Sequence, residues 1–134
     1  MIQKYDKRNK DINVWINGQL IQRDNAKISV FDSLVQGGDG VWEGIRIYEG
    51  GIFCLNKHIN RLIESARSMN FKSIPTATFI KKAIISTLKS NKMYHDTHIR
   101  LTLSRGEKTT SGMNPKLNTF GCTLIVLAEW KSPI

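Results

Sequence analysis

A block of two helical patterns in the middle of this 134-residue chain constrains its fold more than any other feature. Apolar residues recur at helical spacing through NKHINRLIESARSMNF (56–71), and they form one apolar face in TATFIKKAIISTLKSN (76–91). Asn56 is a suitable N-cap for the first helix, and Pro75-Thr76 marks the start of the second. A helix with one apolar face must bury it against another element, so the flanking segments decide the fold class.

Both flanks of this block carry strand patterns. VWINGQLIQ has apolar runs on either side of Asn17-Gly18, a favoured hairpin turn, and GIRIYEGGIFCL resembles a second hairpin that turns at 49–51. After the block, THIRLTLSRG alternates like a half-buried strand, and CTLIVLAEW is a continuous apolar run typical of a buried one. The polar segment GEKTTSGMNPKLNTFG joins these two as a loop. The order predicts an α+β domain, with a mainly antiparallel sheet and two helices on one face.

Composition narrows the function classes. Apolar residues make up 40% of the chain, which is enough to bury a core. The net charge of +9 suggests nucleic-acid binding, but the lysines are scattered and no recognition motif accompanies them, so a solvated basic surface is the better interpretation. No run reaches the length of a membrane span, and the charged first residues do not form a signal peptide. We therefore expect a cytoplasmic protein without nucleic-acid or membrane partners.

The cysteines and histidines predict neither a disulfide nor a metal site. Cys54 and Cys122 each lie in an apolar run and are expected to be reduced, small core residues. His95 and His98 are three residues apart, but no further ligands accompany them, whereas structural zinc needs four well-placed donors. No serine lies in a recognisable nucleophile elbow, so nucleophilic catalysis is not predicted either.

The glycine-rich stretch QGGDGVWEGIRIYEGG (36–51) holds six glycines in sixteen residues. It lacks the Lys-Ser/Thr that closes a P-loop, and Glu43 stands where a dinucleotide fingerprint needs its third glycine. Two interpretations stay open: glycines that serve tight turns and close backbone approach, or the rim of a pocket.

Three arginines also allow two interpretations on local grounds, and for Arg61 the pattern alone favours a stem on the core with the head in solvent. Arg61 lies near the edge of the apolar helix face, where it either lays its stem on the core or offers a charged fork to a phosphate or carboxylate. Arg46 and Arg100 lie in strand patterns, where they either face water or clamp an acidic substrate.

Taken together, the motifs of the chain resemble one family. In chain order, VWINGQLI, GDGVWEGIRIYEGGIF, LNKHINRLIESA, HIRLTLSRG and SGMNP are similar to the fold-type IV (class IV) aminotransferases. These pyridoxal-phosphate enzymes include branched-chain and D-amino-acid aminotransferases and aminodeoxychorismate lyase, and EGIR and GMNP resemble the branched-chain-like members most. The resemblance implies the small N-terminal domain of that fold. It divides the chain into a tail at 1–12, the class IV domain at 13–131 and a truncated interdomain linker at 132–134.

The family motifs imply roles for the open residues. The arginine of H-x-x-R-L binds the cofactor phosphate, which implies Arg61. The aromatic position of V-[FYW]-E-G lines the substrate pocket, which implies Trp42, with Gly44 giving backbone access beside it. Arg46 and Arg100 match positions on the substrate side. One loop resembles a loop that, in the family's dimer, reaches the neighbouring subunit's active site, and it contains Gly112, Met113 and Asn114.

The chain also departs from the family pattern. Family members carry a tyrosine where this chain has Gly37, and Trp42 is bulkier than the usual phenylalanine or tyrosine, so the substrate range is open. The family's Schiff-base lysine lies in a C-terminal domain, so no catalytic lysine is expected here. The resemblance implies a homodimeric enzyme that moves an amino group between an amino acid, of branched-chain type, and a 2-oxo acid. This chain alone is expected to be inactive and to bind no pyridoxal phosphate tightly.

Two alternatives to the enzyme domain remain. One is a stand-alone, non-catalytic remnant that dimerises or binds a phosphate-bearing ligand. The other, ranked last, is a basic nucleic-acid-binding domain.

Overall fold

The computed structural model describes residues 2–133 of the chain, and its first hairpin forms where the sequence predicts it. β1 (Asn13–Ile16) pairs antiparallel with β2 (Gln19–Gln22). Asn17 and Gly18 at the turn both have positive φ. Two left-handed residues match the twist of the strands that they join, which is why Asn-Gly is favoured there.

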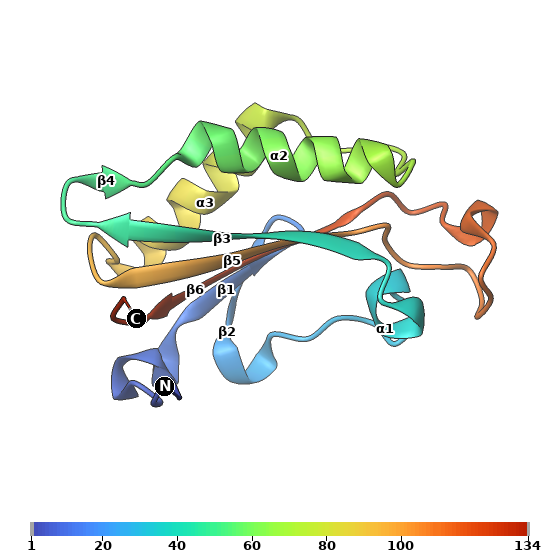
Figure 1. Ribbon diagram of the computed structural model, residues 1–134. Coiled ribbons are helices and arrows are strands. Elements are labelled where there is room, and N and C mark those ends of the chain that lie inside the picture. Colours follow the sequence, from blue (N-terminus) through green and yellow to red (C-terminus); the bar gives the residue numbers. More distant parts are fainter. Residues whose placement is uncertain (1, 134) are drawn as a thin grey trace.

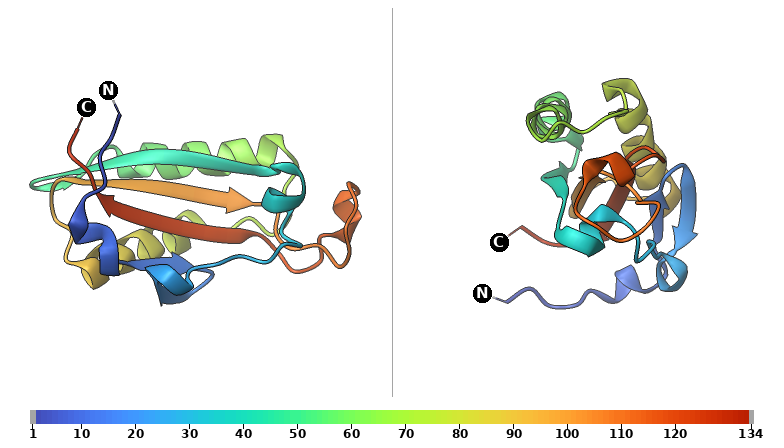
Figure 2. Two further views of the ribbon diagram at one scale, coloured as in Figure 1. Left: turned by 90° about the horizontal axis from the view of Figure 1, so that it is seen from below. Right: turned by 90° about the vertical axis from the view of Figure 1, so that its right-hand side faces the viewer.

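One antiparallel sheet of six strands forms, in the order β2-β1-β6-β5-β3-β4. Its long strands are β3 (Gly40–Tyr48), β5 (Thr97–Ser104) and β6 (Thr123–Trp130), and they lie side by side in the left view of Figure 2. β4 (Gly51–Ile52) completes the second predicted hairpin but pairs only with the last two residues of β3. Within the described chain, the 40–45 edge of β3 therefore has no strand beside it.

Two long helices, α2 (Leu55–Ser68) and α3 (Ala77–Asn91), cover the same face of the sheet (Figure 1), as predicted. α3 begins as expected, because the side chain of Thr76 accepts a hydrogen bond from the backbone N–H of Phe79 at 3.2 Å. The opposite face of the sheet carries no long helix within the described residues. The α+β architecture predicted from the order of the patterns is confirmed.

The start of α2 corrects the sequence prediction. Its N-cap is Cys54, which has a left-handed backbone and makes no side-chain cap, and Asn56 already lies inside the helix. The reason is the short connection from β4: the backbone N–H of His58 bonds the carbonyl of Cys54 at 3.0 Å, so the first turn closes before Asn56 can act as a cap. The same connection leaves Cys54 exposed, so its predicted place in the core is wrong.

The short elements were not predicted. α1 (Ser33–Gly37) is capped by Asp32, whose carboxylate accepts from the Leu34 N–H at 2.9 Å. Asp32 is buried and also accepts from hydroxyl groups of β5 and β6, each at 2.6 Å. This network ties the chain before β3 to the far end of the sheet. The remaining short elements are 3-10 turns, which are η1 (Lys7–Asp11), η2 (Arg23–Asn25) and η3 (Pro115–Leu117).

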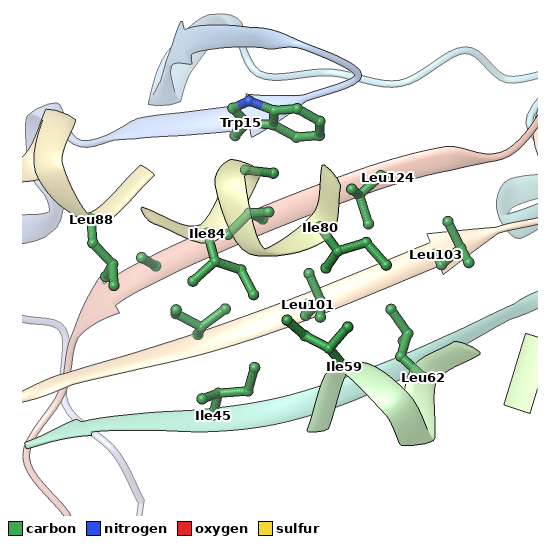
Figure 3. Close-up of a cluster of buried hydrophobic side chains, with 14 of the residues drawn as sticks. Trp15, Ile45, Ile59, Leu62, Ile80, Ile84, Leu88, Leu101, Leu103 and Leu124 are labelled. Atoms are coloured by element: carbon green, nitrogen blue, oxygen red, sulfur yellow. The ribbon is translucent and has the colours of Figure 1, made fainter. Parts of the chain in front are cut away.

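The core lies between the helices and the sheet (Figure 3). Ile59 and Leu62 of α2 and Ile80 and Ile84 of α3 point to the sheet, and all four are buried. The inward strand residues alternate with outward ones, as the half-buried strand patterns predict. Of the described helices, none is both long and apolar enough to cross a bilayer.

Cys122 is partly buried beside this core. Burial raises the pKa of its thiol to about 11, and its Sγ lies 3.3 Å from the carbonyl oxygen of Lys72. Both cysteines are free, as predicted. A thiol with a raised pKa is a weak nucleophile, so Cys122 acts as a packing residue.

Candidate functional site

Alternation along β3 divides the glycine-rich stretch between the two faces of the sheet. The register with β5 places Trp42 opposite Thr102, Gly44 opposite Arg100 and Arg46 opposite His98. Because successive side chains of a strand point to opposite faces, these residues share the face without long helices, and Glu43 points toward α2. We call the first surface the open face and the second the helix face.

Trp42 and Arg100 form a stacked pair on the open face. Trp42 is 57% exposed, and the guanidinium carbon of Arg100 lies 3.9 Å from the centre of its ring. Gly44 lies beside this pair, where a Cβ atom would come within 3.1 Å of Nε2 of His98. Glycine at this position therefore leaves room for the imidazole and for close approach to the backbone.

Arg46 is a cation without a partner on the same face. Its Nε and Nη2 atoms are buried and make no hydrogen bond within the described chain. Its guanidinium carbon lies 5.8 Å from the centre of the Tyr48 ring, which offers a weak cation–π contact but no counter-charge. Burying unpaired donors of a charged group is costly, so Arg46 is a polar residue whose surroundings within the described chain do not satisfy it.

The lowered pKa of His98 reflects both its burial and the positive charges on the open face. Burial lowers the pKa of His98, and the charges of Lys131, Arg46 and Arg100 lower it further, whereas Glu129 offsets part of the effect. The imidazole is therefore held in its neutral form among cations. Neutral, it can accept or donate one hydrogen bond toward the space above Gly44.

The other half of the open face is apolar. A hollow of about 410 Å³ lies over β1 and β6 and is bordered by the segment that follows β2. Its lining is mostly aliphatic, with Val14, Ile16, Ile125 and Leu127 on the strands and Ala26 and Ile28 on the border. Cationic and apolar surfaces thus lie next to each other, an arrangement that fits a ligand with one anionic and one apolar end.

Arg61 lies on the helix face, on the other side of β3. Its Nε is 3.0 Å and 2.8 Å from the two oxygens of Glu43, and its Nη2 is 2.7 Å from Oε1 of the same carboxylate. Nδ1 of His58, one helical turn earlier, lies 2.7 Å from Oε1. Glu43 is thus held by two residues of α2.

Exposure differs sharply within this cluster. The side chain of Glu43 is 6% exposed and that of His58 18%, whereas that of Arg61 is 69% exposed. Burial raises the pKa of Glu43, but the hydrogen bonds from Arg61 and His58 outweigh burial and hold the pKa below its usual value. The hydrogen bond to Glu43 in turn raises the pKa of Arg61. The Arg61 guanidinium is thus held at one edge by Glu43, while most of its side chain faces solvent.

The loop that contains Gly112, Met113 and Asn114 lies beyond the end of the sheet, near α1 (Figure 1). Met113 is exposed, and a Cβ atom on Gly37 would come within 3.4 Å of its Cε. The ammonium group of Lys108 bonds the carbonyl of Gly112, and Asn114 caps η3 through the Lys116 N–H at 3.0 Å. The loop is therefore ordered by its own polar contacts.

The structure brings some predicted site residues together and separates others. Trp42, Gly44, Arg46 and Arg100 form one continuous surface. Arg61 lies across β3 from them, and the unpaired 40–45 edge of that strand lies between the two clusters.

Three residues with clear contacts were missed as site residues, namely Glu43, His58 and His98. The sequence did contain a hint for Glu43. It is a charged residue among the alternate residues of β3 that face the helices, and the others, Val41, Ile45 and Ile47, are apolar. The described residues contain no group of side chains that could hold a metal ion.

The sequence matches a family model over the residues that form this site. Residues 40–130 match the model described as amino-transferase class IV, so the chain belongs to the class IV aminotransferases. A similar curated relative is branched-chain-amino-acid aminotransferase-like protein 2 of Arabidopsis thaliana, 54% identical over 126 residues, which are 94% of this chain and 22% of that protein. The D-alanine aminotransferase of Listeria innocua is 33% identical over 93 residues, covering 69% of this chain and 32% of that one.

Solved structures agree with this assignment. The fold is similar to that of the branched-chain amino acid aminotransferase of Escherichia coli, with a TM-score of 0.80 and 26% identity over 90% of this chain and 40% of that one. The branched-chain aminotransferase of the archaeon Thermoproteus uzoniensis, solved with norvaline, has a TM-score of 0.74 and 26% identity, covering 89% and 40%. The α+β domain is thus the small domain of the class IV aminotransferase fold. This chain spans less than half the length of these relatives.

Proposed function

We propose that this chain is the small N-terminal domain of a pyridoxal-phosphate-dependent aminotransferase that acts on branched-chain-type amino acids and 2-oxo acids. Arg61 binds the cofactor phosphate, and Trp42, Gly44, Arg46 and Arg100 form the substrate side of the pocket. The domain occupies 13–131, with a tail at 1–12 and the start of an interdomain linker at 132–134.

The observation that carries this proposal is the unpartnered guanidinium of Arg46. It lies on the open face beside Arg100 and the neutral His98, and next to an aliphatic hollow. A carboxylate bound beside Arg46 and Arg100 offsets their positive charges, and a branched aliphatic side chain fits an apolar surface. The two halves of the open face thus correspond to the two ends of a branched-chain 2-oxo acid.

The residues present also fit the cofactor. A planar guanidinium with an exposed edge forms paired hydrogen bonds to a phosphate and keeps its charge at any working pH. Arg61 provides such an edge, since Glu43 occupies only the inner one. Pyridoxal phosphate, when bound, supplies the electron sink for amino-group transfer. The residues of this chain bind and orient, and the covalent lysine is assigned to another part of the enzyme.

Two further parts of the proposal concern assembly. The enzyme is a homodimer, in which the loop with Gly112, Met113 and Asn114 contributes to the neighbouring subunit's site. The exposure of Met113 leaves it available for such a contact. A binding-only remnant is the alternative, and it predicts phosphate binding without any role for Trp42 or Arg46.

Titration with 4-methyl-2-oxopentanoate tests the substrate surface. We expect the indole N–H resonance of Trp42 to shift, and the pKa of His98 to rise, because a bound carboxylate offsets the neighbouring cations. Arg46→Met should abolish both responses, whereas Arg67→Met, an exposed arginine on α2, should leave them unchanged. Equal responses in the Arg46→Met variant would contradict the proposal.

Activity provides a second test. The chain by itself should show negligible transamination between leucine and 2-oxoglutarate in the presence of pyridoxal phosphate, since the residue that carries the cofactor covalently is assigned outside it. Measurable turnover by the purified chain would overturn this part of the proposal and leave the carboxylate titration unaffected.

A further inference from the structure

We infer that Glu43 is a positioning residue for Arg61, because its buried carboxylate fixes the inner edge of the guanidinium and turns the outer edge toward the cofactor phosphate. The inference rests on the proposed function, in which Arg61 is the phosphate ligand. It assigns a role to the acidic residue of the VWEG motif, which lies in a row of inward-facing apolar residues.

The hydrogen-bond inventory of the guanidinium supports this role. Arginine has five N–H donors: one on Nε and two on each terminal nitrogen. Glu43 accepts from Nε and from one donor of Nη2, which together form the inner edge. Both donors of Nη1 and the second donor of Nη2 make no hydrogen bond within the described chain and form the outer edge. A phosphate binds such an edge through two parallel hydrogen bonds.

A purely structural ion pair does not explain why one partner of this contact is buried and the other is largely exposed. The carboxylate is buried and the guanidinium is largely exposed. An apolar residue at position 43 would continue the row of Val41, Ile45 and Ile47, and replacing a buried ion pair by apolar packing often stabilises a fold. What Glu43 provides beyond packing is a fixed direction for an arginine that would otherwise move freely in solvent.

His58 completes the arrangement from the same helix. A carboxylate only accepts hydrogen bonds, so Nδ1 of His58 carries the hydrogen in the contact with Oε1 of Glu43. His58 and Arg61 lie one turn apart on α2 and hold the carboxylate between them. These hydrogen bonds hold the carboxylate in one orientation, and the carboxylate in turn fixes the orientation of the guanidinium.

Charge and orientation act in opposite directions on phosphate binding. The negative charge of Glu43 repels a phosphate, whereas a guanidinium that is already ordered loses less conformational entropy when the phosphate binds. Two substitutions separate these effects. Glu43→Asp keeps the charge but withdraws the carboxylate by one methylene. Glu43→Gln removes the charge but keeps the length and one oxygen acceptor.

The experiment is a titration of the 134-residue chain with inorganic phosphate, followed by ¹⁵N NMR at the Nε–H of Arg61. In the unchanged chain, we expect this hydrogen to exchange slowly with water and to shift little on phosphate addition. In Glu43→Asp it should exchange rapidly, and the phosphate affinity should fall about 3- to 10-fold, the cost of ordering one long side chain. Glu43→Gln should retain the original affinity or exceed it.

The outcomes distinguish this inference from the proposed function. If Arg61→Ala does not weaken phosphate binding, Arg61 is not the phosphate ligand and the proposed function loses its cofactor site. If Arg61→Ala abolishes binding while Glu43→Asp titrates like the unchanged chain, the site stands and the positioning role is wrong. Should Glu43→Asp fail to fold, rapid exchange of the Arg61 Nε–H in the unchanged chain overturns the inference by itself.

Discussion

The two faces of β3 differ in how their charged residues are satisfied. On the helix face, Glu43 is buried and receives hydrogen bonds from both Arg61 and His58. On the open face, two nitrogens of Arg46 are buried without a partner in the described chain, and Arg100 contacts an aromatic ring instead of an acid. β3 thus presents a neutralised charge on the helix face, whereas Arg46 of β3 and Arg100 of the neighbouring strand β5 have no acidic partner on the open face.

This difference separates a face that stabilises the fold from a face that is available to a ligand. A face that packs against helices must satisfy every buried polar group, because the unfolded chain would otherwise be favoured. A face reserved for a ligand can leave donors unsatisfied, since the ligand supplies the missing acceptors. Substitutions at neighbouring positions of one strand should therefore differ in their effect on stability, according to the face on which each side chain lies.

Leu101→Ala should destabilise the domain by about 2–5 kcal/mol, because it removes a fully buried side chain from the helix face and leaves a cavity. Thr102→Ala, the next residue of β5, is the matched control, since it lies on the open face opposite Trp42. Chemical denaturation of both variants measures the difference. Losses of equal size would show that the open face is packed as tightly as the helix face.

Arg46→Met should raise the free energy of unfolding by about 1–3 kcal/mol, which is the penalty for burying a polar group without a partner. Methionine keeps much of the length of the side chain while removing the buried donors. Thermal unfolding measures the gain, and Arg8→Met serves as the control because Arg8 is paired with two acids. A destabilised Arg46→Met variant would mean that Arg46 is satisfied in solution.

Acid should weaken the helix face through Glu43. Its folded pKa is lowered, so its contribution to stability is complete above the unfolded carboxyl pKa of about 4.3 and is lost as the pH falls through the folded value. Unfolding measured from pH 6 down to about pH 2 should therefore show a shallower loss in Glu43→Gln than in the unchanged chain. Parallel profiles for the two proteins would assign the acid sensitivity to other carboxylates.

The smallest effect concerns the stacked pair on the open face. Arg100→Gln should reduce stability by about 0.5–1 kcal/mol, the usual worth of an exposed cation–π contact. In the Trp42→Leu background the same change should have almost no effect, so a double-mutant cycle isolates the contact. The denaturation midpoints of the unchanged chain, the two single variants and the double variant provide the stabilities that the cycle compares. Additive losses would show that the two side chains do not interact in solution.

Local patterns were sufficient for most of the fold. The Asn17-Gly18 turn and the Thr76 cap depend on neighbouring residues alone, and both formed as predicted. Where a tertiary constraint overrode the local preference, the prediction was wrong: the short connection after β4 closed the first turn of α2 at Cys54 and not at Asn56. α1 was missed because its cap, Asp32, is stabilised by residues of two distant strands.

Only part of the candidate site could be predicted from the sequence. Resemblance selected Trp42, Arg46, Arg61 and Arg100, and their assigned roles remain predictions. The contact between Arg61 and Glu43 joins residues 18 positions apart, so no local period connects them. The unpartnered state of Arg46 is a property of its surroundings, which a single strand pattern does not contain.

Local patterns were enough to predict the type and order of the long helices and strands, because hairpin turns and alternating or helical periodicity depend on residues close in the chain. The tertiary structure alone decided which charges are neutralised. Burial and hydrogen-bond partners depend on which strands and helices become neighbours, and that choice placed Glu43 under α2 and left Arg46 unpaired within the described chain on the open face. The chemistry proposed for this domain follows from that placement.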